Sequence, residues 1–460
     1  MRKHYWMLAV VALILTASAE ECYWIGTGGD SYWTNPGNWK DGKIPGQYWD
    51  ADGNLAGQMG DVAVFGSTEC VKRTASMGNL ASVGGLKFVG TDPEQYTIGW
   101  PNQKLPLEMN GFGIEIDADV AQIPIFAAGI IPGENAEGQQ WIPTKDLAKN
   151  HIYLVNNTEQ VLDIPRFNCQ TARITGSKTT GDWPFVTIHF SGKGGYTLHS
   201  GDGNGMDEFV FNQEGVFTFA RTIIAREGGA DDFAPVHLST GPDVKKARIC
   251  IPEGIVVVPR PLGPYIRAEK ADLEFFGAGT LGIPWGSGNG LGHVSVGTGR
   301  TLTIGCSVGV SNGKTIVQGS DLQMNFDNIA SGAVVRITGP NISEGPVQFM
   351  GKGTFEAMAI DGTDGQGDFG LGSRISMAGG GELKYMGPGE TTTRTIALVN
   401  KNANGAGMSA ALRLTHVGTG PWTVRTSCST HPPTDRFIWT ARATTRRSVA
   451  RSRTAAQTTS

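Results

Sequence analysis

A glycine-rich acidic turn near the middle of the chain carries the side chains best suited to bind a metal ion. Asp202, Asn204 and Asp207 supply carboxylate and amide oxygens within the stretch DGNGMDEF that starts at Asp202. Oxygens of these two kinds are the ligands that Ca²⁺ prefers in proteins. These three residues are therefore the candidate Ca²⁺ ligands, and a solvated acidic turn without an ion is the competing interpretation.

The same turn approaches the calcium-binding nonapeptide pattern G-G-x-G-x-D-x-U-x, with Asp207 at the ligand position and Phe209 at the inward apolar position. Each ion in such arrays is shared between consecutive turns, so a single copy supplies only part of a coordination shell. A second acidic loop, with Asp361, Asp364 and Asp368, has the same weakness. Apart from Ca²⁺, the sequence predicts no cofactor.

Adjacent carboxylates at Asp231 and Asp232 are the residues that could cleave a glycan, because glycosidases use paired acids. The segment Gly292-His293 is similar to the Gly-His segment of polygalacturonases. The other motifs of that family, Asn-Thr-Asp and Arg-Ile-Lys, have no counterpart here. A β-helical polysaccharide-degrading enzyme is therefore an alternative function, and we expect no catalytic residues in the favoured one.

Two further motifs have structural explanations. Ser311 lies in a G-x-S-x-G string, but a hydrolase nucleophile must lead into a helix, and the residues that follow predict a strand. The sequons that start at Asn156 and Asn341 would accept a glycan only in a eukaryotic secretory route. Neither motif predicts a function for the chain.

The composition predicts short buried strands joined by many turns. The chain has 460 residues, of which 66 are Gly, and charged residues make up only 17%, against about 25% in an average protein. Apolar runs of strand length recur at 185–190, 216–219 and 301–304. We therefore expect an all-β fold, a right-handed parallel β-helix or similar β-solenoid, over residues 81–424.

A short phrase recurs within this region: an apolar residue, Gly-x-Gly, then Thr or Tyr and another apolar residue. It occurs around Gly192, Gly277 and Gly351, and in looser form around Gly379 and Gly418. The spacing is irregular. Solenoid coils accept loops of different length on one face, so irregular spacing is compatible with stacked coils.

Residues 20–80 form a separate motif in which Trp24, Trp33 and Trp39 are set among Gly, Asn, Asp and Pro, which predicts short strands and tight turns. The pattern resembles the opening segment of autotransporter-passenger-like β-solenoid repeat proteins of bacterial surfaces. The resemblance implies a structural or adhesin-like surface protein whose partners are surface glycans or other cell-surface proteins. We interpret the tryptophans as a cap over the first coil; a small β-motif without that role is the alternative.

Residues 1–19 have the features of a secretory signal peptide: Arg2 and Lys3, an apolar run, and Ala17-Ser18-Ala19. We therefore expect export to the cell surface or beyond, with no transmembrane segment after removal of the signal. The net charge of −4 and the absence of a basic face argue against nucleic acid as a partner. Cys22 and Cys70 either form a disulfide or remain isolated buried thiols.

The composition changes over residues 425–460. This stretch has no Gly, and it contains seven arginines but only one acidic residue, Asp435. This stretch predicts a disordered basic tail. It is interpreted either as a segment that binds an acidic polymer or membrane surface, or as the product of a shifted reading frame. In the second case the chain would be a truncated, non-functional autotransporter-like fragment, which is the third candidate function.

Overall fold

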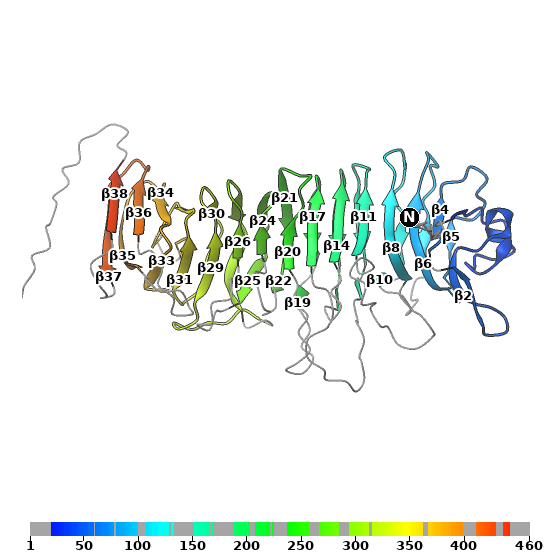
Figure 1. Ribbon diagram of the computed structural model, residues 1–460, viewed down its shortest axis with the longest axis horizontal. Helices are drawn as coiled ribbons and strands as arrows, with labels where there is room; N and C mark the ends of the chain where they lie inside the picture. The colour runs from blue at the N-terminus through cyan, green and yellow to red at the C-terminus, as the bar shows by residue number, and fades with distance from the viewer. Residues whose placement is uncertain are drawn as a thin grey trace, which may run out of the picture.

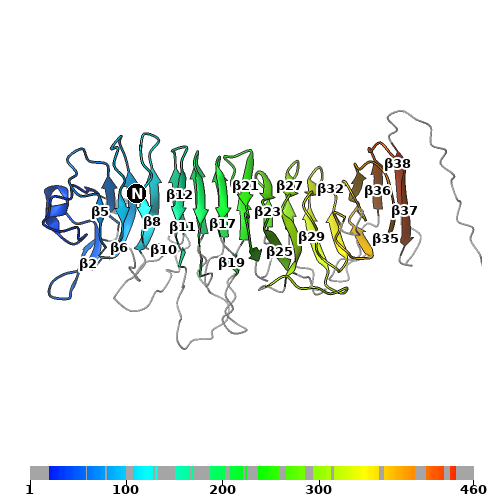
Figure 2. The same cartoon turned by 180° about the vertical axis from the view of Figure 1, so that it is seen from behind.

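The structure is a computed structural model of the chain. It describes residues 20–58, 60–77, 80–99, 107–127, 130–132, 151–165, 167–168, 187–199, 201–202, 208–220, 223–224, 237–257, 266–284, 294–311, 315–361, 367–398, 411–428 and 436–441. The predicted signal peptide lies outside these residues. Figures 1 and 2 show an elongated stack of strands, with β1 to β6 at one end and β37 and β38 at the other.

Parallel strands from successive coils form one ladder, here called sheet 1, along the whole stack. Its strands pair in this order: β1 (Glu21–Tyr23), β4 (Val62–Phe65), β6 (Leu80–Phe88), β8 (Leu107–Ile116), β11 (His151–Asn156), β14 (Thr187–Gly192), β17 (Glu208–Gln213), β20 (His237–Thr240), β23 (Ile266–Ala268), β26 (Val294–Val296), β29 (Met324–Ile329), β31 (Val347–Gly351), β33 (Arg374–Ala378), β35 (Glu390–Leu398) and β37 (Trp422–Cys428).

A second parallel ladder, sheet 2, contains the strand that follows each sheet 1 strand in most coils. It consists of β12 (Val161–Ile164), β15 (Gly195–Leu198), β18 (Val216–Phe219), β21 (Lys246–Cys250), β24 (Asp272–Phe276), β27 (Thr301–Ile304), β30 (Val334–Ile337), β32 (Thr354–Ala357), β34 (Glu382–Tyr385), β36 (Ala411–His416) and β38 (Arg436–Ala441). A shorter parallel set of β5 (Thr74–Ala75), β7 (Thr97–Ile98) and β9 (Ile125–Phe126) belongs to the earlier coils.

The third side of the coils is shorter. Sheet 3 joins β19 (Ile223–Ile224), β22 (Ile255–Val257), β25 (Thr280–Pro284) and β28 (Ser307–Ser311), and β10 (Ile130–Pro132), β13 (Phe167–Asn168) and β16 (Gly201–Asp202) extend from the first part of β8. The chain thus passes from sheet 1 to sheet 2 to sheet 3 and returns to sheet 1 one coil further on. The described part of the chain contains no α-helix, and the predicted parallel β-solenoid is confirmed.

The N-terminal motif departs from this parallel pattern. Two 3₁₀ turns, η1 (Pro36–Asn38) and η2 (Lys40–Gly42), precede an antiparallel hairpin of β2 (Gly46–Trp49) and β3 (Leu55–Gln58). Strand β2 also pairs with the start of β6, antiparallel to it. The motif is therefore joined to sheet 1 by backbone hydrogen bonds as well as by side chains.

Inward side chains of neighbouring coils stack on one another to form the core. Phe190 on β14 and Phe211 on β17 lie with ring centroids 5.8 Å apart and planes at 12°, and Phe217 on β18 meets both rings edge-on. All three rings are fully buried. A coil could not bury these rings alone, so each coil depends on its neighbours for its apolar surroundings.

The recurring Gly-x-Gly phrase lies at corners between sheets. Gly192 ends β14 at the corner from sheet 1 to sheet 2, with φ of +94°, and an added Cβ would lie 2.1 Å from the carbonyl oxygen of Asn156. Gly277 lies between β24 and β25, at the corner from sheet 2 to sheet 3, with φ of +115°. The phrase has irregular spacing because two different corners of the coil use it.

The ladders continue past residue 424, where the sequence predicts the disordered tail to begin. Residues 425–428 extend β37, which pairs with β35, and Arg436–Ala441 form β38, which pairs with β36. The predicted start of the tail is therefore wrong, because the preceding coil offers free backbone groups that a Gly-poor segment can also pair with. Residues 442–460 lie outside the described residues.

Replacing Phe211 by Ala should lower the free energy of unfolding by about 3–5 kcal/mol, because it opens a cavity against Phe190 and Phe217. Val210 points to the other face of β17, so Val210→Ala is the matched control and should change stability by less than about 1 kcal/mol. Urea unfolding followed by far-UV circular dichroism measures both. Equal effects of the two substitutions would contradict the stacked core.

Candidate functional site

The predicted Ca²⁺ ligands are largely outside the described residues. Asp202 ends β16, whereas Asn204 and Asp207 are not among the described residues. Within the described ranges, no group of three or more His, Cys, Asp or Glu side chains is arranged to hold a metal ion. The Ca²⁺ site therefore stays a prediction.

Asp361, in the second acidic loop, is held by protein groups. Its carboxylate forms an ion pair with the buried guanidinium of Arg394, with Nε and Oδ1 2.9 Å apart, and it accepts a hydrogen bond of 2.7 Å from the Thr392 hydroxyl. Burial lowers the pKa of Arg394. These contacts give Asp361 a structural role between neighbouring coils.

Asp368, from the same loop, is almost fully buried. Its Oδ2 accepts hydrogen bonds from the backbone N–H groups of Met358 and Ala359. Burial raises the pKa of Asp368 to about 6, and the nearby carboxylate of Glu390 acts in the same direction. Asp364 lies outside the described residues.

Of the residues considered for catalysis, the structure describes Ser311 alone. Asp231, Asp232 and His293 lie outside the described residues. Ser311 is the last residue of β28 and is fully buried, and it forms an antiparallel bridge with Ile316. A nucleophile must be reachable by its substrate, so the G-x-S-x-G string is a strand end, as its sequence context indicates.

The first sequon is a buried corner. Asn156 is fully buried; its Oδ1 accepts hydrogen bonds from the N–H (3.2 Å) and the hydroxyl (2.7 Å) of Thr158. Its Nδ2 donates to the carbonyl of Gln160 at 2.9 Å and to that of Gly195, in the next coil, at 3.3 Å. One side chain therefore fixes both the turn after β11 and the contact with the following coil.

The second sequon repeats this geometry. Asn341 is fully buried and its Oδ1 accepts from the N–H (3.1 Å) and the hydroxyl (2.6 Å) of Ser343. Its Nδ2 donates to the carbonyl of Asp368 at 3.1 Å. In both places the Asn side chain closes its own turn and also forms a hydrogen bond to another coil. Neither amide is accessible for glycosylation in the folded chain.

The three tryptophans form one buried cluster at the end of the stack. Trp39 meets Trp24 and Trp33 edge-on, with ring centroids 5.0 and 4.8 Å apart, and Phe65 of β4 lies against the cluster. Each indole N–H donates to a carbonyl, of Lys72 (2.6 Å), Pro45 (2.9 Å) or Trp33 (2.6 Å). The rings are thus both packed and hydrogen-bonded, as buried tryptophans need to be. The proposed capping role stays a prediction.

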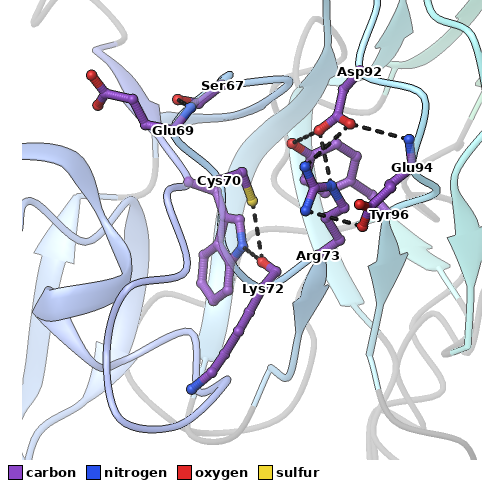
Figure 3. Close-up of polar contacts among 9 residues, drawn as sticks. Ser67, Glu69, Cys70, Lys72, Arg73, Asp92, Glu94 and Tyr96 are labelled. Carbon is purple, nitrogen blue, oxygen red and sulfur yellow. Dashed lines mark hydrogen bonds and ion pairs between the residues drawn. The ribbon is translucent and has the colours of Figure 1, made fainter.

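Polar side chains beside this cluster join the motif to the next coils, and Figure 3 shows their contacts. Arg73 pairs with Asp92 at 3.0 Å, and the Tyr96 hydroxyl donates to Asp92 at 3.1 Å. The Cys70 thiol donates to the carbonyl of Lys72 at 3.2 Å, and burial raises the pKa of this thiol. A thiol held in this way is a poor nucleophile.

Of the two alternatives for Cys22 and Cys70, the structure has the isolated thiols and no disulfide. Both are buried free cysteines. Cys22 lies in β1, and burial together with the carboxylate of Asp61 raises its pKa to about 12. The packing of the tryptophan cluster and the pairing of β1 with β4 close the N-terminal segment without a covalent link.

A group of aromatic and polar side chains on the outside of sheet 1 is absent from the sequence-based candidates. One residue from each of seven successive strands lies in register, and we call this line the outer row: Tyr153, His189, Val210, Ser239, Arg267, Ser295 and Asn328. The alternation of inward and outward residues along each strand produces this row.

The first part of the outer row is aromatic. The Tyr153 and His189 rings lie with centroids 4.6 Å apart and planes at 13°, and 43% of Tyr153 is exposed. His151, two residues before Tyr153, has its Nδ1 2.8 Å from Nε2 of His189. Burial, together with the neighbouring His151, lowers the pKa of His189 to about 4, so its ring is uncharged at neutral pH.

Beyond Val210 the outer row is polar, and its side chains bind acidic residues that lie beside the row. Oε1 of Glu208, on β17, accepts hydrogen bonds from the Ser239 hydroxyl and from Nη1 of Arg267, the latter at 3.4 Å. The Ser295 hydroxyl donates to Glu269 at 2.7 Å. Ser239 and Ser295 are buried, so the partly exposed Glu208 and Arg267 are the fixed polar groups that a ligand with many hydroxyl groups can reach here.

The sequence predicts which of these side chains point outward, but it does not predict which strands are neighbours. The alternation in the segments HIYLVN and TIHFSG indicates that His151 and Tyr153 share a face and that His189 points outward from its own strand. It does not indicate that β11 and β14 are neighbours, because that pairing depends on how the coils stack. The outward direction of each side chain is therefore predictable from the sequence, but the contact between them is not.

Comparison with protein-family models, with curated proteins and with solved structures found no match to this chain. Among the residues that the structure describes, no helix has the length and apolar character required to cross a membrane.

Replacing Asn156 by Ala should destabilise the protein by about 1–3 kcal/mol for each buried group that loses its partner. The neighbouring Asn157→Ala is the control, since the Asn157 side chain is only half-buried. Thermal or urea unfolding measures both variants. An Asn156→Ala variant as stable as the control would disprove the stabilising role of the Asn156 hydrogen bonds.

The raised pKa of Asp368 makes stability depend on pH in a defined direction. The folded chain binds a proton at this carboxyl group more tightly than the unfolded chain, so the free energy of unfolding falls as pH rises from about 4 to about 6. Asp368→Asn keeps an oxygen for the two backbone N–H groups and cannot ionise. The variant should therefore match the native protein near pH 4 and exceed it by about 1–3 kcal/mol at pH 7. A constant difference across this pH range would contradict the assignment.

Proposed function

We propose that this chain is an exported structural or adhesin-like protein of a bacterial surface that binds glycans through the outer face of sheet 1, without catalysis. The observation that supports this proposal most strongly is the stacked aromatic pair of the exposed Tyr153 and the half-buried His189, set on a long parallel sheet. The resemblance of residues 23–65 to the opening segment of surface β-solenoids supports export and a surface role.

The chemistry of the outer row favours a carbohydrate over a charged polymer. Tyr153 offers a flat aromatic surface, on which the apolar face of a sugar ring can pack, and its own hydroxyl group. The His189 ring beside it is uncharged at neutral pH. Further along the row, the charge of Arg267 is paired with Glu208. A neutral or weakly charged glycan therefore fits these groups better than a polyanion.

Binding to an array of neutral and acidic glycans tests this function. Tyr153→Ala should weaken binding by at least tenfold if the ring provides the stacking surface, since stacking of this kind contributes about 1–3 kcal/mol in other systems. Tyr23→Ala is the matched control, because Tyr23 is also partly exposed (38%) and lies in β1, at the far end of the same sheet. Equal binding by both variants, or no glycan bound by the native protein, would contradict the proposal.

A polysaccharide-degrading enzyme is the second candidate, and one observation favours it. Glu208 places a carboxylate on the outer face, in contact with Ser239 and Arg267 and opposite His237 in the adjacent strand. Incubation with pectin and related glycans separates the candidates: release of reducing ends or unsaturated products that is lost in Glu208→Gln would support the enzyme. No product from the native protein would leave binding as the function.

A further inference from the structure

Two imidazole nitrogens converge on the outside of sheet 1. Strands β11 and β14 are parallel neighbours, with Tyr153 in register with His189. Ile152 and Leu154 point inward and are buried, so His151 points outward with Tyr153. Both histidines are half-buried, and Nδ1 of His151 lies 2.8 Å from Nε2 of His189.

We propose that His151 and His189 chelate one divalent transition-metal ion of the kind that takes ligands at right angles, with Cu²⁺ as the best fit. Imidazole nitrogens bind such ions at about 2.0–2.1 Å, so two of them at a right angle are about 2.8–3.0 Å apart, whereas a tetrahedral ion holds them about 3.3–3.4 Å apart. The observed 2.8 Å lies in the right-angle range, but it is also the length of the hydrogen bond between the metal-free rings, so the choice of Cu²⁺ depends on its affinity for imidazole nitrogen. Tetragonal coordination by nitrogen and oxygen is typical of Cu²⁺ and Ni²⁺, and Cu²⁺ is bound more tightly.

The metal-free arrangement is a hydrogen bond, in which one ring nitrogen donates a proton to the other. An ion at equal distance from both nitrogens lies beside the line that joins them, so binding requires each ring to turn about its Cβ–Cγ bond. The ring that donates this hydrogen bond must move its single proton to its other nitrogen through solvent, and the accepting ring keeps its proton where it is, so binding releases no net proton. The Tyr153 ring, parallel to that of His189, supports one face of the chelate.

Two charged groups beside the pair act in opposite directions on a bound cation. The carboxylate of Glu208 attracts positive charge toward His189, and the ammonium group of Lys270 opposes it. Because the described residues contain no group of three or more such ligands, water or a bound ligand would complete the shell. The site does not depend on glycan binding.

Titration of the full chain with Cu²⁺ at pH 7, followed by electron paramagnetic resonance, tests this site. The native protein should bind one ion whose spectrum shows two nitrogen ligands. His151→Gln and His189→Gln should each lower the affinity by at least tenfold and leave one nitrogen or none. His199→Gln is the control and should behave as the native protein, because His199 is partly exposed and contacts Asp163 instead, at 3.0 Å.

The nitrogen count in the native spectrum does not depend on the folding of any variant. A native spectrum with fewer than two nitrogens would overturn the proposal. Unchanged affinity and spectrum in the double variant His151→Gln/His189→Gln, with far-UV circular dichroism equal to that of the native protein, would also overturn it.

Discussion

Parallel pairing between consecutive coils is the constraint on which the rest of this structure depends. The strands of sheets 1 and 2 are short, and their inward side chains would be exposed in an isolated coil. Phe190, Phe211 and Phe217 are buried only because three strands from two successive coils bring them together. Stability is then a property of neighbouring coils, as in other repeat architectures.

The second constraint applies at the corners, where each coil must turn sharply without leaving buried polar groups unpaired. Glycine meets it where the backbone of the neighbouring coil is too close for a Cβ, as at Gly192. Asn156 and Asn341 meet it by hydrogen bonding within the turn and across to the next coil. The same amide group thus closes a turn and sets the register between coils, which explains why an Asn-x-Ser/Thr pattern occurs in a buried position.

The outer face is a consequence of the same stacking. Because strands pair in register, one outward residue per coil falls on a straight line, and the line from Tyr153 to Asn328 brings together residues that are far apart in the sequence. The aromatic pair, the histidine pair and the Glu208 network are all products of this alignment. Changes in a single outward residue therefore alter the surface without disturbing the core beneath it.

The sequence predicts local properties well and pairings between coils poorly. Strand alternation, the glycine corners and the three tryptophans are local signals, and they are sufficient for the fold class. The register that places His151 against His189 is set by packing between coils and has no local signal. Composition misleads in one place, because the Gly-poor residues 425–428 and 436–441 still join the ladders.

Spin labels on neighbouring coils test the stacking most directly. Thr197 on β15 and Thr218 on β18 are outward residues in register, so labels at these positions in a chain without its native cysteines should lie on strands about 4.8 Å apart. A parallel, in-register stack gives strong spin–spin broadening for this pair and much weaker broadening for Thr197 with Thr303, several strands further along sheet 2. The same weak broadening for both pairs would contradict a parallel, in-register solenoid.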